Sequence, residues 1–318
     1  MAGQPEKLAC LRVAPLRLRL ETRGPFRTPE YKGAVFRGGF GKFFRELVCT
    51  TGKPTCAGCP EASGCRYSLV FETPVIPEKF TVLRKYSHAP HPFVLTPPLD
   101  GRTALPAGAE LDVELTLIGP GVDYLPYFIG VFEMLGESGR FGGPFRVREA
   151  VSALDGRELV YEGESRRWLG PPPLWRPGSA PQPVRRLRLE FLTPLRIRTG
   201  GRYNASPDFV AITHALLRRI HLLAAVYGGG DGDAGWLRPL LKQADAVVTE
   251  RASFALYRWS RTSGRQKRTV PMDGVVGWLE AAGELTELAP YLRAGEWLQV
   301  GSGTSLGMGK YRASMSAN

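Results

Sequence analysis

Four of the five cysteines lie in one short segment and could bind a metal ion. They are Cys49, Cys56, Cys59 and Cys65, which form a C-x6-C-x2-C-x5-C pattern among Gly, Pro and Thr residues. Four thiolates from such a turn-rich segment can close a tetrahedral zinc site, and an iron–sulfur cluster is the less favoured occupant. The alternative is a loop of reduced cysteines without metal, because the spacing departs from the paired CxxC pattern of zinc ribbons. We expect a structural zinc here.

A second candidate segment is rich in glycine and lies near the C-terminus, from Val300 to Tyr311. Glycine allows a phosphate to approach backbone N–H groups closely. The segment does not match a nucleotide-binding loop, since that pattern requires glycine where Thr304 stands and Ser or Thr after Lys310. The candidate phosphate-binding residues are Gly301, Gly303, Gly307, Gly309 and Lys310.

A third candidate segment is strongly basic and contains one tryptophan. Its basic residues set RNA affinity through the release of counterions, and Trp259 could stack on an unpaired base. The alternative is a solvated basic hairpin. The members are Arg258, Trp259, Arg261, Arg265, Lys267 and Arg268.

The histidines show no known catalytic motif. His88 and His91 lie in a proline-rich loop. His214, Arg218 and His221 share a helical stripe that could face RNA, although we expect it to face water. The sequence has no GxSxG or HExxH motif, and no compact set of Asp and Glu predicts a two-metal nuclease. Phosphodiester chemistry would therefore use protein acids and bases, with no cofactor for catalysis.

Composition and charge indicate a globular protein with a polyanionic partner. The chain has 318 residues, 43% of them hydrophobic, which excludes wholesale disorder. Lys and Arg number 42 against 30 Asp and Glu, giving a formal net charge of +12 that favours nucleic acid as partner. No stretch reads as a signal peptide or a membrane span, so we expect a cytoplasmic protein without a membrane partner.

The elements that must position these residues fall into two similar halves. Residues 168–183 contain six prolines and are expected to form a stiff linker. Each half begins with an alternating strand, so Leu16, Leu18 and Leu20 correspond to Leu187, Leu189 and Phe191, and each strand leads toward a helix. We expect helices over 38–48 and from Ser206 to Gly228, and strands over 111–118, 145–152, 158–162 and 246–259. The pattern favours an α+β fold over a doubly wound parallel sheet.

These segments together resemble the CRISPR repeat-processing endoribonucleases, the sixth Cas family within the RAMP superfamily. The resemblance spans most of the chain. It rests on AVFRGGFGKFFRELVC, YSLVFETP, HPFVLTPP, FLTPLRIRTGG, RWSRTSGRQ and VGSGTSLGMGKYR. It implies two tandem ferredoxin-like (RRM-like) domains with antiparallel sheets. We expect the first over 1–167, with the cysteine cluster at 49–65 as an insertion, and the second over 184–318, with the basic hairpin and the glycine-rich loop.

The resemblance implies metal-independent cleavage of precursor CRISPR RNA. The ribose 2′-hydroxyl attacks the adjacent phosphate and leaves 2′,3′-cyclic phosphate and 5′-hydroxyl ends, which requires a base, an acid and cationic groups. Family members often place a histidine on or beside the first helix, but no histidine precedes His88 here. Lys42 is our first catalytic candidate, because Arg37 and Arg45 could lower its pKa, with Tyr31 as its partner and His91 and His88 as alternatives. Arg37, Arg45 and Arg202 are further candidate RNA contacts.

The expected partners are CRISPR repeat RNA or crRNA, and subunits of a CRISPR effector complex. Two other functions compete with cleavage. One is a non-catalytic crRNA-binding RAMP subunit of such a complex, and the other is a zinc-stabilised module that binds protein.

Overall fold

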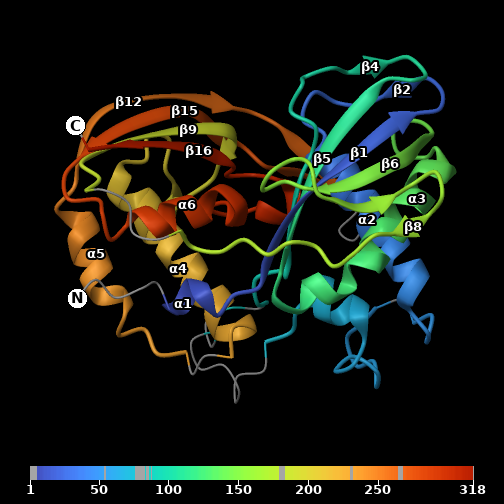
Figure 1. Ribbon diagram of the computed structural model, residues 1–318, viewed down its shortest axis with the longest axis horizontal. Coiled ribbons are helices and arrows are strands. Elements are labelled where there is room, and N and C mark those ends of the chain that lie inside the picture. The colour runs from blue at the N-terminus through green and yellow to red at the C-terminus, as the bar shows by residue number, and fades with distance from the viewer. Residues whose placement is uncertain are drawn as a thin grey trace. The chain divides into compact units, whose positions relative to one another are not determined.

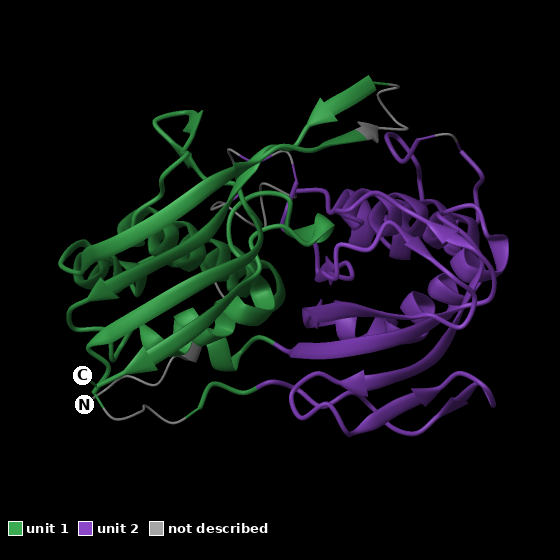
Figure 2. Cartoon of the chain, turned by 90° about the horizontal axis from the view of Figure 1, so that it is seen from above, with its two compact units in different colours: residues 1–11, 176–318 green, residues 12–175 purple. Residues whose placement is uncertain are grey.

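The chain divides into two compact units. The computed structural model describes residues 6–53, 55–75, 83, 86, 88–178, 183–229, 232–263 and 268–317. Unit 2 is Arg12–Trp175, and unit 1 combines Met1–Leu11 with Arg176–Asn318 (Figure 2). The division lies inside the proline-rich segment 168–183, and Trp168 at its start belongs to a short strand of unit 2.

Unit 2 is built on an antiparallel sheet with the strand order β3-β5-β1-β6-β7-β8 (Figure 1). Along the chain, the four strands β1, β3, β5 and β6 and the two helices α2 and α3 follow each other as β-α-β-β-α-β. Strand β1 lies in the centre of the sheet, which is the ferredoxin-like arrangement. The elements are β1 (Val13–Thr22), α2 (Gly33–Val48), β3 (Phe93–Thr96), β5 (Glu110–Ile118), α3 (Leu125–Ser138), β6 (Phe145–Ser152), β7 (Leu159–Glu162) and β8 (Arg167–Trp168).

Unit 1 repeats this arrangement with the strand order β12-β15-β9-β16 (Figure 1). The expected α+β fold of two tandem ferredoxin-like domains is therefore confirmed. The repeated elements are β9 (Arg186–Leu195), α4 (Phe209–Tyr227), β12 (Val248–Tyr257), β15 (Gly274–Ala282), α6 (Ala289–Leu298) and β16 (Tyr311–Ser316). Two helices are additions to it, α1 (Glu6–Ala9) and α5 (Leu237–Asp245).

The two alternating strands occupy equivalent central positions. Leu16, Leu18 and Leu20 on β1 are buried, as are Leu187, Leu189 and Phe191 on β9, because side chains on a strand alternate between the helix-covered face and the open face. The predicted internal repeat is therefore confirmed. In unit 2, the aromatic residues of α2 and α3 complete the core, with the rings of Phe40 and Phe128 stacked 4.9 Å apart.

Two predictions about helices need correction. The helix expected from residue 38 begins at Gly33. Helix α4 is capped by Asp208, whose carboxylate accepts a hydrogen bond from the Ala211 N–H, rather than by Ser206. The sequence pattern predicted no membrane span, but helix α4 is long and apolar enough to cross a bilayer. Of its most apolar window, 61% is buried, as expected for a core helix.

Two short hairpins, one further strand pair and three helical turns are the other elements of the described residues. The hairpins are β10 (Arg198–Thr199) with β11 (Arg202–Tyr203), and β13 (Ser260–Ser263) with β14 (Arg268–Pro271). The further pair joins β2 (Phe26–Arg27) to β4 (Ala104–Leu105), which lie far apart in the sequence. The turns are the π-helix η1 (Ser68–Glu72) and the 3-10 helices η3 (Gly119–Tyr124) and η4 (Thr304–Leu306).

Candidate nucleic-acid interface

One face of α2 borders an open, mainly cationic pocket. Lys42, Arg45 and Lys53 line it together with Glu46 and Tyr67. The Lys42 side chain is 51% exposed, and its Nζ lies 3.9 Å from Glu46 Oε1. Lys42 therefore stands in solvent beside a carboxylate, and the pocket keeps a cationic excess because Arg45 and Lys53 also line it. We call this the α2 pocket.

A row of alternating arginines and aromatic rings runs beside this pocket. The Arg37 guanidinium lies 4.3 Å from the ring centroid of Phe71, and the Arg45 guanidinium lies 5.7 Å from that of Tyr67. The rings of Tyr67 and Phe71 are stacked 5.2 Å apart. Gly41 stands one helical turn from each arginine, and a Cβ there would lie 2.8 Å from Arg37 Nη1. The glycine therefore leaves room for the Arg37 guanidinium.

The structure brings His91 to the same aromatic rings as Arg37. The His91 ring stacks on Phe93 with 5.7 Å between centroids and lies 6.5 Å from Phe71. The Arg37 guanidinium is 5.6 Å from the Phe93 centroid. A cation of α2 and a histidine from a distant loop thus share one pair of rings. His88 is exposed, and its Nδ1 is 2.8 Å from the Glu72 carbonyl oxygen.

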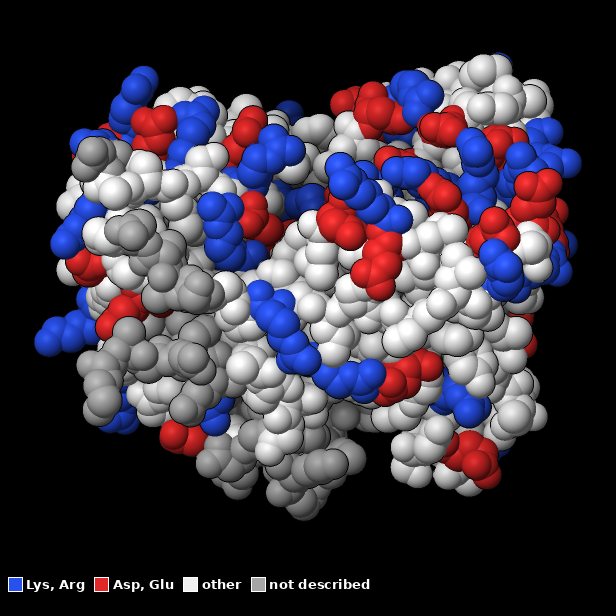
Figure 3. Space-filling model, in the orientation of Figure 1, with Lys and Arg blue, Asp and Glu red and all other residues white. Residues whose placement is uncertain are grey.

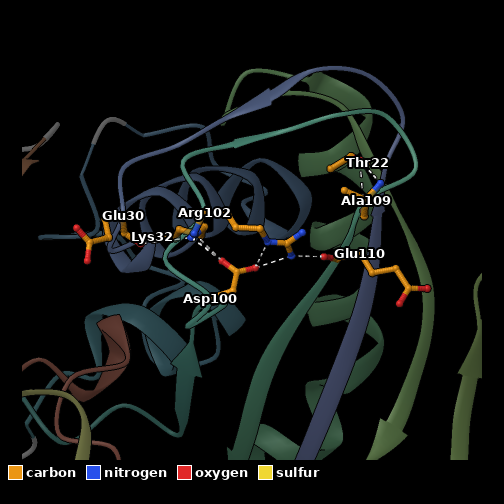
Figure 4. A network of polar contacts seen from close by, with 7 residues as sticks. All are labelled: Thr22, Glu30, Lys32, Asp100, Arg102, Ala109 and Glu110. Atoms are coloured by element: carbon orange, nitrogen blue, oxygen red, sulfur yellow. Dashed lines mark hydrogen bonds and ion pairs between the residues drawn. The ribbon is translucent and has the colours of Figure 1, made fainter.

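The segment that leads into α2 is held by a buried lysine (Figure 4). Lys32 is fully buried, and its Nζ lies 3.1 Å from Asp100 Oδ1. Asp100 also pairs with Arg102, which donates a hydrogen bond of 2.7 Å to the Glu110 carbonyl. Burial raises the pKa of Asp100, but the hydrogen bonds from Arg102 and Lys32 outweigh it, so the pKa is lowered overall. Tyr31, the residue before Lys32, is half-exposed, and nothing in the sequence predicted this ion pair.

The four clustered cysteines line one pocket at the C-terminal end of α2. Cys49, Cys56, Cys59 and Cys65 are half-buried free thiols. The backbone of Gly52 and the Thr51 hydroxyl lower the pKa of Cys49 through hydrogen bonds. Among the described residues, no group of three or more His, Cys, Asp and Glu is placed to hold a metal ion. The described side chains therefore give no support to the expected zinc site.

In unit 1, the glycine-rich segment folds into a compact loop with all four glycines at positive φ. A Cβ at Gly309 would lie 1.8 Å from the Val300 carbonyl oxygen, and one at Gly301 would lie 2.6 Å from that of Arg196. Several backbone N–H groups bond within unit 1, such as Gly309 to Pro194 and Met308 to Gly303. The later glycines, Gly307 and Gly309, are buried. These two glycines serve the loop's conformation, whereas Gly301 and Gly303 are half-exposed and Ser302 is exposed.

Arg196 joins this loop to the β10–β11 hairpin. Its carbonyl accepts a hydrogen bond of 2.9 Å from the Ser302 N–H. Its guanidinium lies 3.8 Å from the Tyr203 ring centroid and donates to the Pro271 carbonyl at 3.3 Å. Arg198 lies across the hairpin at 4.6 Å from the same ring. Of this hairpin, only Arg202 was expected to contact RNA, although Gly200-Gly201 between two strand-like segments is a signal for a two-residue hairpin turn.

The basic segment forms the β13–β14 hairpin. Arg258 and Arg268 are exposed and Arg261 is half-exposed, while Arg265 and Lys267 lie outside the described residues. Trp259 is half-buried at the base of the hairpin, where its carbonyl accepts the Met272 N–H at 2.9 Å. Lys310 lies after the glycine-rich loop, with its Nζ 5.6 Å from the Trp297 ring centroid.

The open face of the unit 2 sheet is, by contrast, covered with paired charges. In the view of Figure 3, basic and acidic side chains intermingle over this unit. Cross-strand ion pairs account for the mixture, and they leave this face a poor site for a polyanion. The pairs are Arg17 with Asp112, Arg19 with Glu149, Arg146 with Glu21, and Arg148 with Glu110.

Two protein-family models match successive parts of the chain. Residues 11–173, which correspond to unit 2, match the AF_1859 N-terminal domain. Residues 189–311, within unit 1, match the CRISPR-associated endoribonuclease Cas6. An uncharacterized protein of Archaeoglobus fulgidus is 25% identical over 291 residues, which is 90% of this chain and 93% of the relative.

Solved structures show the same fold. Thermus thermophilus Cas6 matches with a TM-score of 0.54 and 16% identity, over 96% of this chain and 99% of that chain. A Cas6 product complex matches with a TM-score of 0.52 and 21% identity, over 96% and 99% of the two chains. A Cas6-RT-Cas1–Cas2 complex matches with a TM-score of 0.56 and 12% identity, over 96% of this chain and 46% of that chain.

Proposed function

The chain belongs to the Cas6-type CRISPR-associated proteins and carries the AF_1859 N-terminal domain; from this premise, we propose that it binds CRISPR repeat RNA and cleaves it by a metal-independent reaction. The observation that carries the proposal is the meeting of Arg37 and His91 on the Phe71 and Phe93 rings, beside the cationic α2 pocket. A titratable group and a fixed cation beside a phosphate-binding pocket are what phosphodiester transesterification requires.

His91 is the proposed acid–base group. In the reaction, a base accepts the proton of the ribose 2′-hydroxyl, the 2′ oxygen bonds to phosphorus, and the bond from phosphorus to the 5′ oxygen breaks. An acid then returns a proton to that oxygen. Histidine suits either proton transfer near neutral pH. Arg37 would stabilise the negative charge of the phosphorane, and Lys42 and Arg45 would hold the adjacent phosphates.

We therefore move the first catalytic assignment from Lys42 to His91. Lys42 is an exposed residue paired with Glu46, whereas His91 is half-buried against a ring that also supports Arg37. Tyr31 and His88 stay candidates for the second proton transfer. Tyr31 directly precedes the buried Lys32, and His88 lies on the same loop as His91.

The test is single-turnover cleavage of the genomic repeat RNA in EDTA. We expect His91→Ala to slow cleavage by about 100-fold or more, the usual contribution of an acid–base group, with little loss of affinity. Lys42→Ala should instead weaken RNA binding more than it slows the cleavage of RNA that is already bound. His214→Ala, which removes a histidine of unit 1, is the matched control. Equal cleavage by the His91→Ala variant would contradict the assignment.

A non-catalytic RNA-binding subunit is the second candidate function. The absence of histidine from the sequence of α2 favours it. Such a subunit would bind the repeat RNA as tightly but release no fragment with a cyclic phosphate. End-group analysis of the RNA after incubation distinguishes the two functions, and association with CRISPR effector subunits is expected of either.

We further propose that the four-cysteine pocket binds one structural zinc ion. The proposal rests on the number, spacing and shared pocket of the thiols, which line the end of α2 without forming a coordination group. Purified protein should contain about one zinc per chain, and replacing Cys56 and Cys65 by Ser should remove it. Cys10→Ser, at an exposed cysteine of unit 1, should retain the metal. Wild-type protein purified without zinc would contradict the proposal.

A further inference from the structure

The β10–β11 hairpin presents a tyrosine flanked by two arginines. Gly200 and Gly201 form its two-residue turn, both at positive φ, which places Arg198 directly opposite Tyr203. Tyr203 is 44% exposed, and its hydroxyl accepts a hydrogen bond of 3.0 Å from Arg198 Nη2. The Arg196 guanidinium lies 3.8 Å from the centroid of the same ring. One aromatic side chain therefore fixes two cations.

These cations differ from most arginines on the two sheets. On β9, Arg186 pairs with Glu250 and Arg188 pairs with Glu280. Within the described residues, neither Arg196 nor Arg198 has a carboxylate within ion-pair distance. Two guanidinium groups that are ordered by a ring, rather than by a counter-ion, retain their full charge for an anionic ligand.

The arginine pair stands beside the exposed beginning of the glycine-rich loop. Ser302 bonds to the Arg196 carbonyl through both its N–H and its hydroxyl, at 2.9 and 3.2 Å. Gly301 packs so tightly on the same carbonyl that a Cβ would not fit. The loop, the hairpin and Arg196 therefore form one continuous surface of unit 1.

We propose that Arg196, Arg198 and Tyr203 form a clamp for a backbone phosphate of the bound RNA. Arg198 donates to the phosphate, Arg196 supplies the second charge, and Tyr203 holds both guanidinium groups in place. The proposal rests on RNA being the partner. It adds to that function a binding site on unit 1 that is separate from the α2 pocket.

The experiment measures the affinity of the full chain for repeat RNA over a salt series. The RNA carries 2′-O-methyl riboses, so that no 2′-hydroxyl can attack. We expect Arg198→Gln to weaken binding about tenfold and to lower the slope of log affinity against log salt by about one phosphate contact. Tyr203→Leu should act similarly, whereas Tyr203→Phe, which keeps the ring, should stay within about threefold of wild type.

Arg238→Gln is the matched control, because it removes one exposed arginine of the same unit from α5. We expect it to change affinity by less than about twofold. The clamp is refuted if Arg198→Gln and Tyr203→Leu, with unchanged melting temperatures, behave as Arg238→Gln does. Failure of the wild-type protein to bind the RNA at all would instead refute the proposed function.

Discussion

Lys32 shows how a single residue can fix the start of the helix that carries the proposed site. A fully buried ammonium group is tolerated only with a close partner, and Asp100 supplies it at 3.1 Å. Nothing in the sequence marks Lys32, because its partner lies 68 positions away in a loop. An exposed lysine and a buried lysine cannot be told apart from the amino-acid sequence alone.

Removing this partner should destabilise unit 2. Asp100→Asn leaves the buried ammonium without its counter-ion, and we expect a loss of about 2 to 3 kcal/mol in the free energy of unfolding, since Asp100 is itself partly exposed. Because the folded pKa of Asp100 is lowered, the wild-type protein keeps this stabilisation above pH of about 4 and loses it as the pH falls further.

The measurement is urea unfolding at pH 7 and between about pH 3 and pH 4. The variant should lack this part of the acid dependence. Asp112→Asn breaks an exposed ion pair with Arg17 and should cost less than about 1 kcal/mol. Equal costs for the two variants would mean that Lys32 does not depend on Asp100.

At the scale of elements, α2 depends on its glycines in different ways. Gly38 is exposed, and a Cβ there would meet nothing within 4 Å, whereas one at Gly41 would reach Arg37. The sequence presents both as parts of GGFGK, and only the packing tells them apart.

Alanine at Gly38 should therefore change stability, whereas alanine at Gly41 should change the rate of RNA cleavage. Gly38→Ala should stabilise unit 2 by about 0.5 to 1 kcal/mol through helix propensity, with unchanged RNA cleavage. Gly41→Ala should displace the Arg37 guanidinium from Phe71 and slow cleavage at least about tenfold, with little effect on stability. Thermal unfolding and single-turnover rates check both. Normal cleavage by Gly41→Ala would show that the position of Arg37 is unimportant.

Elements with strong periodicity could be predicted from the sequence, but their partners could not. The alternating residues of β1 and β9 and the apolar stripe of α4 specify their own structure, so these elements appear as expected. Helices α3 and α6 were not anticipated, since α3 is apolar on nearly all sides and α6 contains Pro290 and Gly295. The Arg37–His91 pairing was also missed, because only tertiary packing brings that loop to α2.

At the scale of the whole molecule, the chain's first residues belong to the unit formed by its last ones. Leu8 and Leu11 are 1% exposed, and α1 packs against α4. The prediction of one continuous first domain from residue 1 did not foresee this, since α1 is too short for a periodic signal.

Deleting residues 1–11 should destabilise unit 1 and spare unit 2. Burial of two leucines contributes about 3 to 5 kcal/mol, so the unfolding transition of unit 1 should move to lower temperature. Calorimetry, with Trp236 fluorescence as a probe within unit 1, would detect the shift. Replacing Leu8 and Leu11 by Ala in the full chain should reproduce most of it. Unchanged unfolding of the shortened chain would contradict this assignment.

The placement of α1 also determines the order of events during synthesis. Unit 2 is one uninterrupted stretch and can acquire its structure as soon as Trp175 has left the ribosome. Leu8 of α1 and the nearby Leu11 are synthesised before unit 2, yet α4, against which α1 packs, begins only at Phe209, after unit 2 has been translated. The apolar side chains of Leu8 and Leu11 are therefore without their binding surface while unit 2 folds, and unit 1 closes only when its two separate segments meet.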